Sequence, residues 1–372
     1  MTHESAPRAT SSIDRDEFGQ VVLVLQGGGA LGAYQAGTYQ ALHEAGLEPD
    51  WVIGTSIGAI NASLIAGNPP AQRLSRLTEF WTRISNRPAA RFLGAMPLFG
   101  PLAANAMTIA AGVPGFFEPN PWAFLSPETT LGAEHAGFYS TQPMEATLGE
   151  LTDETLLNAG HPRLTVGAAN VQTAHMHYFD SRDMPLTVKH IAASGALPPA
   201  FPAVRIDDAF YWDGGVLSNT PIEAIFDDSP RQSALVFAVH MWAPNGPPPD
   251  SIAKVLARQK DIQYSSRMAN EVARQKQLHK LRHVITRLAE AAQTPELRAL
   301  KEYGCVTRMH VMRLIAPPMA GEDHSKDIDF SPKGIHARWD AGYADMKGVL
   351  AAAPWTAPYD PLEGLVLHEI RM

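Results

Sequence analysis

The sequence is poor in cysteine and has no excess of basic charge, and each shortage excludes a class of protein. Cys305 is the single cysteine among 372 residues, so no disulfide can form within the chain. A reducing, cytoplasmic compartment is therefore the default expectation. The formal net charge of −8 argues against general nucleic-acid binding, because neutralising phosphates requires a basic surface.

Patterns typical of metal sites are also missing. The sequence contains neither an H-E-x-x-H segment nor a calcium-loop pattern. His175 and His177 stand two apart on a predicted strand and would face one side, but no carboxylate or cysteine partner is suggested nearby. We expect no metal and no cofactor.

Long apolar runs are absent or interrupted. Residues 1–19 are polar and mixed in charge, without the apolar core of a signal peptide, and we expect them to form a disordered leader. Residues 92–117 carry no charge, but three prolines and four glycines break the run. A membrane-spanning helix needs about 20 predominantly apolar residues, so we predict no transmembrane segment.

The first folded part alternates short apolar runs with helical segments. Hydrophobic residues make up 45% of the chain, enough for a large core. Residues 21–25 and 51–53 predict buried strands, and residues 32–46 and 57–66 predict helices that end at glycines. This rhythm is typical of a parallel α/β sheet.

The later part of the chain predicts further strands, then a change of character. Strand-like runs lie at 164–170, 175–179, 210–212 and 234–240. Residues 243–250 are rich in proline and predict a linker. We therefore expect one domain over residues 20–242 and a C-terminal extension over residues 251–372, helical with one strand at 309–315.

Residues 54–58 read Gly54-Thr-Ser56-Ile-Gly58 and match G-x-S-x-G. A nucleophilic serine needs a strained strand-to-helix turn, and small flanking residues are required where the backbone is crowded. The predicted strand before Ser56 and helix after it supply that context. A structural glycine turn that happens to contain serine is the alternative.

Gly27-Gly28-Gly29-Ala-Leu-Gly32 satisfies G-x-G-x-x-G and allows a dinucleotide interpretation. That interpretation requires an acidic residue at the end of the second strand, but Asp50 precedes the strand. We favour an oxyanion hole, because three glycines expose backbone amides at a strand end beside the serine.

Asp213-Gly214-Gly215 follows the predicted strand 210–212 and is the candidate base for Ser56. Glycines allow the close approach that a direct carboxylate–serine hydrogen bond demands, although Asp-Gly turns are common. A triad of Ser56, Asp213 and His240 is the competing arrangement. The dyad is preferred because α/β-hydrolases place several strands before the serine turn, and here only one precedes it.

These three blocks, in order and spacing, resemble the patatin-like phospholipase family. Residues 193–202 (ASGALPPAFP) are similar to a fourth block of that family, so the resemblance covers about residues 20–240. Leu31 departs from the basic residue that the family often has there, which leaves anion steering at that position in doubt. The C-terminal part is similar to an uncharacterised extension in one bacterial subgroup.

The resemblance implies a three-layer α/β/α fold with a mainly parallel central sheet. It also implies a lipid acyl hydrolase with Ser56 as nucleophile, Asp213 as base and the amides of the glycine block as oxyanion hole. An acyltransferase on the same site and a non-catalytic regulatory protein remain alternatives. The sequence does not predict the oligomeric state.

Two segments could bring lipid to such a site. Residues 92–117 end in Gly115-Phe116-Phe117, and we hypothesise that Phe116 and Phe117 bind acyl chains or membrane, against simple packing over the core. Residues 251–303 contain 11 Lys or Arg against 5 Asp or Glu. They form either an ordinary solvated helix pair or a surface for anionic lipid at the inner face of the membrane.

Overall fold

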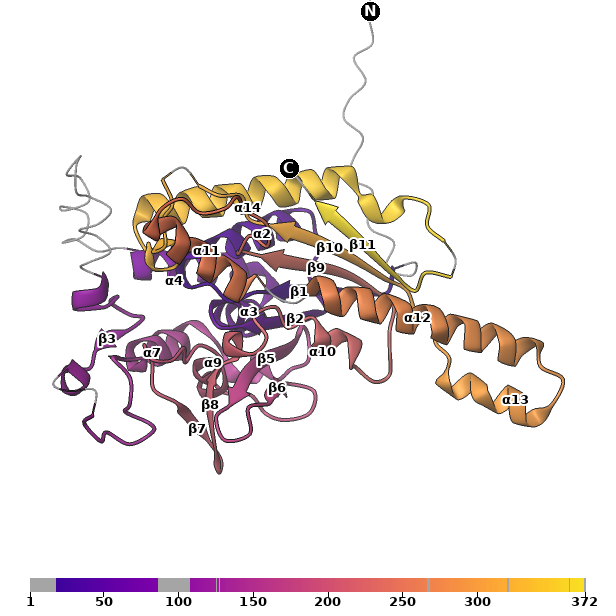
Figure 1. The fold of residues 1–372 in the computed structure, drawn as a ribbon, viewed down its shortest axis with the longest axis horizontal. Coiled ribbons are helices and arrows are strands. Elements are labelled where there is room, and N and C mark those ends of the chain that lie inside the picture. The colour runs from indigo at the N-terminus through magenta and orange to yellow at the C-terminus, as the bar shows by residue number, and fades with distance from the viewer. Residues whose placement is uncertain are drawn as a thin grey trace, which may run out of the picture.

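The computed structural model describes residues 18–85, 108–124, 126, 128–265, 268–319, 321–360 and 362–370. Its centre is a nine-stranded sheet in the order β11-β10-β9-β1-β2-β5-β8-β7, with β6 paired to β5 (Figure 1). The strands are β1 Gln20–Leu25, β2 Trp51–Thr55, β5 Arg163–Asn170, β6 Met176–Asp180, β7 Val204–Ile206, β8 Ala209–Asp213, β9 Ala234–His240, β10 Met309–Ile315 and β11 Leu365–Ile370. A separate two-stranded sheet pairs β3, Glu118–Pro119, with β4, Tyr139–Ser140.

Helices cover both faces of the central sheet. The helices are α2 Ala33–Glu44, α3 Ile57–Ala66, α4 Pro70–Ser85, α7 Gln142–Leu151, α8 Glu154–Leu157, α9 Val188–Ser194, α10 Glu223–Phe226, α11 Ile252–Tyr264, α12 Met268–Ala291, α13 Pro295–Ala299 and α14 Pro332–Ala352. Short 3₁₀ helices include η1 Gly29–Gly32, η2 Pro121–Phe124, η3 Gly214–Val216, η4 Leu300–Tyr303, η5 Lys326–Ile328 and η6 Pro354–Thr356. Within the described residues, no helix combines the length and apolar character needed to cross a bilayer.

Alternation along β1 shows why the sheet is buried on both sides. Val21, Leu23 and Leu25 pack into one core cluster with α2, α3, α4 and α14. Val22 and Val24 point the other way, into a second cluster with α10 and α12. Successive side chains of a strand face opposite sides, so an unbroken apolar run fits a sheet between two helical layers. The predicted α/β architecture is confirmed.

The C-terminal extension is built into this sheet. Strand β10 pairs in parallel with β9, and β11 pairs in parallel with β10. Helix α14 lies along α2, where Trp339 Nε1 donates to Gln40 Oε1 at 2.6 Å and the Tyr34 hydroxyl donates to Asp345 Oδ2 at 2.7 Å (Figure 1). Residues 309–315 form the predicted strand.

The prediction of one strand in the extension was wrong, because β11 is a second. Most of its side chains are only half buried, and it includes His368 and Glu369. An edge strand of this kind carries a weak apolar signal. Residues 1–17 of the predicted leader and residues 92–107 of the uncharged segment lie outside the described residues. Phe18 is buried in the core, so the folded structure begins before residue 20.

Candidate active site

Ser56 lies on a strained turn between β2 and α3. Its φ of 58° and ψ of −127° are rare for a residue with a side chain. A Cβ on Gly54 would lie 2.4 Å from the Gly58 backbone, and one on Gly58 would lie 2.2 Å from the Leu25 carbonyl oxygen. Both glycines are therefore required for this turn, which has the geometry that G-x-S-x-G predicted.

Ser194 supports the turn from the fourth sequence block. The Ser56 amide donates to both the carbonyl oxygen and the hydroxyl oxygen of Ser194, at 3.1 and 3.0 Å. The Ser194 hydroxyl in turn donates to the Gly167 carbonyl at 2.6 Å. The block could be recognised in the sequence, but the support that Ser194 gives to the turn could not.

The sheet topology explains why Ser56 and Asp213 meet. Strands β2 and β8 both pair with β5 on the edge opposite β6, with Thr55 beside Gly167 and Asp213 beside Ala168. Because β2 runs parallel to β5 and β8 runs antiparallel, their carboxyl ends point at each other along one edge. Residues 157 positions apart in the chain are thus brought together by the pairing register.

Asp213 is buried and hydrogen-bonded. Its side chain is 2% exposed, lines the same cavity as Ser56, and accepts a hydrogen bond from the Gly215 amide at 2.7 Å. Burial raises the pKa of Asp213 to about 7, although the neighbouring Ser56 side chain and the Gly215 amide favour the ionised form and lower it. The carboxylate is therefore a stronger base than an exposed aspartate.

His240, the third member of the competing triad, lies elsewhere. It is fully buried, and its Nε2 lies 2.8 Å from Met268 Sδ, in the cluster on the α12 side of the sheet. Burial, helped by Arg313, lowers the pKa of His240 to about 3. Among the described residues, no hydrogen bond links it to Ser56 or Asp213.

The glycine loop between β1 and α2 lies beside Ser56. The Gly27 amide donates to the Asn219 carbonyl at 3.1 Å, so it is already used within the protein. No acceptor for the amides of Gly28 and Gly29 occurs among the described residues. Of the three predicted oxyanion-hole amides, two are therefore available, and Gly32 packs against Ile57 at the start of α3.

Asp50, the acidic residue of the dinucleotide alternative, has a structural partner at the other end of the strands. Its Oδ2 accepts a hydrogen bond from the Val21 amide at 2.7 Å, near the amino ends of β1 and β2. The glycine loop follows the carboxyl end of β1. The two features that a dinucleotide site must combine are thus at opposite ends of the strands. The described residues also contain no group of three His, Cys, Asp or Glu side chains placed to hold a metal ion.

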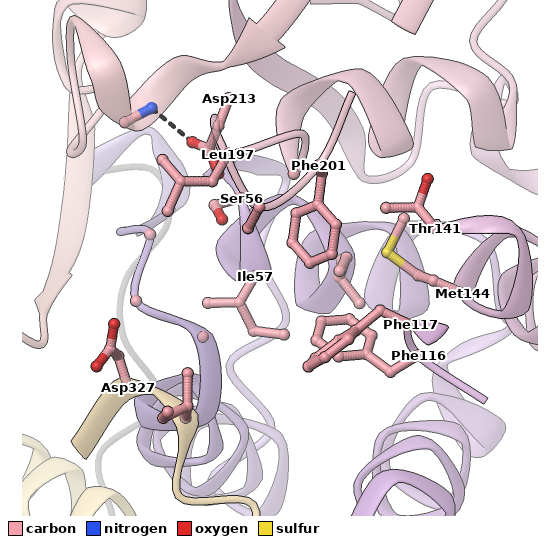
Figure 2. Close-up of a pocket in the computed structure, with 18 of the residues that line it drawn as sticks. Ser56, Ile57, Phe116, Phe117, Thr141, Met144, Leu197, Phe201, Asp213 and Asp327 are labelled. Atoms are coloured by element: carbon pink, nitrogen blue, oxygen red, sulfur yellow. Dashed lines mark hydrogen bonds between the residues drawn. The ribbon is translucent and has the colours of Figure 1, made fainter. Parts of the chain in front are cut away.

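An apolar cavity of about 230 Å³ opens from Ser56 (Figure 2). Ser56 and Asp213 lie at one end, and Thr141 and Met144 lie on the far side of the phenylalanine rings in this view. Phe116 and Phe117 line the cavity, although both are buried, at 9% and 7% exposed. Other apolar lining residues are Ile57, Ile60, Ile109, Leu197, Ala200, Phe201, Ile328 and Phe330.

Two residues that the sequence analysis missed hold the glycine loop. Asn219 Nδ2 and Trp242 Nε1 both donate to the Gly27 carbonyl, at 3.1 and 2.8 Å. Asn219 lies four residues beyond Gly215, and Trp242 lies just beyond the end of β9. Neither is part of a motif, and no feature of the sequence alone points to them.

The C-terminal extension closes the cavity above the glycine loop. Tyr264, Asp327 and Phe330 line it, and the Asp327 backbone oxygen would lie 2.3 Å from a Cβ on Gly29, whose φ is +57°. Two crossed ion pairs join α11 to η5: Lys260 Nζ to Asp327 Oδ1 at 2.7 Å and Lys326 Nζ to Asp261 Oδ1 at 2.8 Å. We call these two pairs the α11–η5 clasp.

The chain is thus an α/β protein of a recognisable class. A serine on a tight strand-to-helix turn lies beside a glycine loop and a buried aspartate. Residues 23–226 match the family described as patatin-like phospholipase, and residues 262–362 match one described as patatin phospholipase. The first match covers more than half of the chain, and the chain belongs to the patatin-like phospholipase family.

Individual relatives are similar over short stretches. A patatin-like phospholipase domain-containing protein of Caenorhabditis elegans is 45% identical over 60 residues, which is 16% of this chain and 6% of the relative. Lysophospholipase nte1 of Aspergillus terreus is 56% identical over 46 residues, or 12% of this chain and 3% of the relative. The chain thus spans only a small part of the length of these proteins.

Solved structures are similar at low identity. VipD from Legionella pneumophila has a TM-score of 0.40 at 18% identity, over 90% of this chain and 67% of that chain. Full-length ExoU in complex with SpcU, from the type III secretion system of Pseudomonas aeruginosa, has a TM-score of 0.30 at 17% identity, over 90% and 79%.

Proposed function

We propose that the protein is a lipid acyl hydrolase, of the phospholipase A or carboxylesterase type, that cleaves carboxylic esters through Ser56 and Asp213. The observation that carries this proposal is that Ser56, on its strained turn, and buried Asp213 lie together at the end of an apolar cavity. Membership of the patatin-like phospholipase family supports the choice of substrate class.

The reaction has two halves. Ser56 Oγ attacks the ester carbonyl carbon while Asp213 accepts the hydroxyl proton, and the carbonyl oxygen becomes an oxyanion. The carbon–alkoxy bond then breaks, and the proton on Asp213 passes to the departing alcohol, which leaves an acyl-enzyme. Water attacks that ester with Asp213 again as base, releasing the fatty acid and restoring Ser56.

The electrostatics of the site suit this chemistry. A general base works best when its pKa is near the working pH, and burial brings Asp213 to about 7. The amides of Gly28 and Gly29 can donate to the oxyanion, and one such donor contributes about 10²- to 10³-fold in rate. The α3 N-terminus at Ile57 adds a favourable dipole.

The apolar cavity is the proposed acyl-chain site. Phe116, Phe117 and Phe201 form its aromatic wall, so the hypothesis for Phe116 and Phe117 becomes one of chain binding rather than direct membrane contact. Replacing them with Ser would remove buried rings and destabilise the core by several kcal/mol, about 3–5 for a Phe→Ala change. Met144→Trp is a cleaner test, because it fills the end of the cavity away from Ser56 (Figure 2).

Met144→Trp should lower kcat/KM for long-chain nitrophenyl esters at least tenfold and leave acetate esters within about threefold. The added ring would occupy the far end of the chain site and leave the reacting end open. Equal losses on both substrates would show that the cavity does not select chain length.

Helix α11 supports peripheral contact with a membrane. Its apolar residues Ile252, Val255, Leu256 and Ile262 lie on one side and are exposed, while Tyr264 on another side reaches the cavity. A helix with an exposed apolar stripe beside a lipid-binding cavity is suited to the bilayer surface. The double variant Ile252→Ser and Ile262→Ser should sediment less with phospholipid vesicles and still hydrolyse dissolved short esters at the wild-type rate. Unchanged sedimentation would contradict contact between α11 and the membrane.

The decisive test of the proposed function is Ser56→Ala. Purified protein should release fatty acid from a panel of phospholipids and from nitrophenyl esters, and should react with a serine-directed phosphonate. The alanine variant should lose both activities while its thermal melting stays the same, because only a hydroxyl is removed. Full turnover in the variant would refute Ser56 as nucleophile.

The same assays separate the alternatives. An acyltransferase would form new esters when an alcohol acceptor is added, at the expense of free fatty acid. A non-catalytic regulatory protein would neither turn over any ester nor bind the phosphonate.

A further inference from the structure

Tyr264, the last residue of α11, lines the cavity, and its hydroxyl group has no hydrogen-bond partner among the described residues. Hydroxyls elsewhere on the wall are bonded within the protein: that of Tyr139 donates to the Ile109 carbonyl at 2.7 Å, and that of Thr141 donates to Glu145 Oε1 at 3.4 Å. Tyr264 lines the same space as Ser56 and Asp213. An uncommitted donor beside the reacting groups is available to a substrate.

The position of Tyr264 is fixed by the loops of the site itself. Its carbonyl oxygen accepts hydrogen bonds from Asn219 Nδ2 at 2.8 Å and from Gln26 Nε2 at 3.1 Å. Its ring packs on Trp242, with centroids 5.1 Å apart, and Trp242 Nε1 holds the Gly27 carbonyl. The residue therefore comes from the extension but is held by the glycine loop and by the segment that follows Asp213.

The charges around Tyr264 favour its protonated form. Burial, then the negative charges of Asp213 and Asp327, raise the pKa of the Tyr264 phenol. A phenol with a raised pKa keeps its proton at neutral pH and acts as a hydrogen-bond donor rather than a proton source. Tyr264 lines the same cavity as Asp213, the carboxyl group that must return a proton during the proposed reaction.

We propose that the Tyr264 hydroxyl donates a hydrogen bond to the alkoxy oxygen of the ester as the alcohol departs. This inference rests on the proposed function. The amides of Gly28 and Gly29 serve the carbonyl oxygen and Ser56 supplies a second oxygen of the tetrahedral centre, so the third, the alkoxy oxygen, is left to face Asp213 and its neighbours. As the carbon–alkoxy bond breaks, the electron pair moves to the alkoxy oxygen. The proton from Asp213 completes the alcohol, and Tyr264 keeps its own proton.

The contribution of such a donor depends on the leaving group. An alkyl or glyceryl alkoxide develops a large negative charge as it departs, whereas nitrophenolate is stable without help. A donor to the leaving oxygen therefore matters for alkyl esters and little for nitrophenyl esters of the same acid. A merely structural role for Tyr264 would affect both substrates alike.

The test compares Tyr264→Phe with Tyr139→Phe, a matched control in the same cavity whose hydroxyl is bonded to the protein. Glyceryl and nitrophenyl esters of one fatty acid are assayed for kcat and KM separately. Tyr264→Phe should lower kcat for the glyceryl ester by about 10- to 100-fold and change the nitrophenyl ester less than about threefold. Tyr139→Phe should change the ratio of the two substrates by less than about twofold.

The outcomes separate this inference from the proposed function. If the wild-type protein hydrolyses both esters and Ser56→Ala abolishes this turnover, the proposed acyl hydrolase function is supported whatever Tyr264 does. If Tyr264→Phe then lowers both substrates equally, or neither, the role of Tyr264 is overturned and the function stands. If the wild-type protein hydrolyses neither ester, both are overturned.

Discussion

Two regions of the molecule meet at the cavity, residues 20–60 and residues 260–330, and they reach it by different physical means. The first runs continuously from β1 through the glycine loop and α2 to the Ser56 turn, so its geometry follows from backbone conformation and small residues. The second meets the site through ion pairs, ring contacts and two carbonyl groups, that of Asp327 against Gly29 and that of Tyr264 bonded to Asn219 and Gln26.

The difference separates the proposed reacting groups from the residues that enclose the cavity. The first region contains Ser56 and the free amides, and Asp213 joins it through the register of β5. The second region contributes the wall of Tyr264, Asp327 and Phe330. Changes to reacting groups should abolish turnover and spare the fold, whereas changes to the enclosure should alter activity moderately.

The largest effect should come from Asp213→Asn, compared with His240→Ala. The amide cannot accept the Ser56 proton, so kcat/KM should fall by about 10³-fold or more. His240→Ala removes a group that packs beside Met268. The activity of this variant per folded molecule should stay close to that of the wild type. Nitrophenyl ester hydrolysis, measured per folded molecule, gives the comparison. The reverse result would require a histidine triad.

The pH dependence of the same pair sharpens the assignment. Asp213 must be ionised to act, so kcat/KM of the wild type should rise with pH and level off above about 7. Stability should move the other way. The pKa of Asp213 is raised in the folded state from 3.8, so the folded protein loses stability as pH increases from about 4 to about 7. Urea melts of Asp213→Asn should lack that loss; a parallel pH dependence would show that Asp213 is not perturbed.

The residues of the first region could be predicted from the sequence because their motifs encode backbone geometry. Ser56 needs Gly54 and Gly58, and three adjacent glycines leave few structural options at a strand end. The order of elements around them predicted the α/β class. The free amides could not be counted in advance, because Gly27 is occupied by Asn219, a partner 192 residues away.

A smaller effect should come from Gly29, the point where the two regions touch. Gly29→Ala places a Cβ against the Asp327 carbonyl oxygen and strains a φ of +57°. We expect kcat to fall by about 10- to 100-fold, because the loop must shift and misplace an amide of the proposed oxyanion hole.

Gly46 is the matched control, with a φ of +69° and no atom within 4 Å of a Cβ. Gly46→Ala imposes similar strain at a helix end far from the contact, and its cost should be about 1 kcal/mol of stability with little change in kcat. Similar kinetic losses in both variants would mean that backbone strain, rather than the contact with Asp327, matters at Gly29.

The contribution of the second region could not be predicted from the sequence. The basic composition of residues 251–303 left open an ordinary solvated helix pair or a lipid-facing surface, yet Lys260 in this stretch pairs with Asp327 within the protein. Tyr264 belongs to no motif. Side chains that act through contacts between α11 and η5, about 65 residues apart, leave no local pattern, and charge counts do not distinguish an internal pair from a solvated lysine.

The smallest effect should come from the α11–η5 clasp, and it tests whether the enclosure depends on ion pairs. Lys326 and Asp261 are 12% and 16% exposed, so their attraction is less screened than that of a surface pair. A double-mutant cycle with Lys326→Met and Asp261→Asn should give a coupling of about 1 kcal/mol in urea melts. Lys254 lies on α11 and Asp250 just before it, and both are mostly exposed. They form the control pair, and their coupling should be near zero.

The activity of Lys326→Met should fall only about two- to fivefold, because α11 stays attached through Tyr264 and its bonds to Asn219 and Gln26. Equal couplings in the two cycles would mean that the clasp is an ordinary surface interaction and that apolar packing alone holds the extension over the cavity.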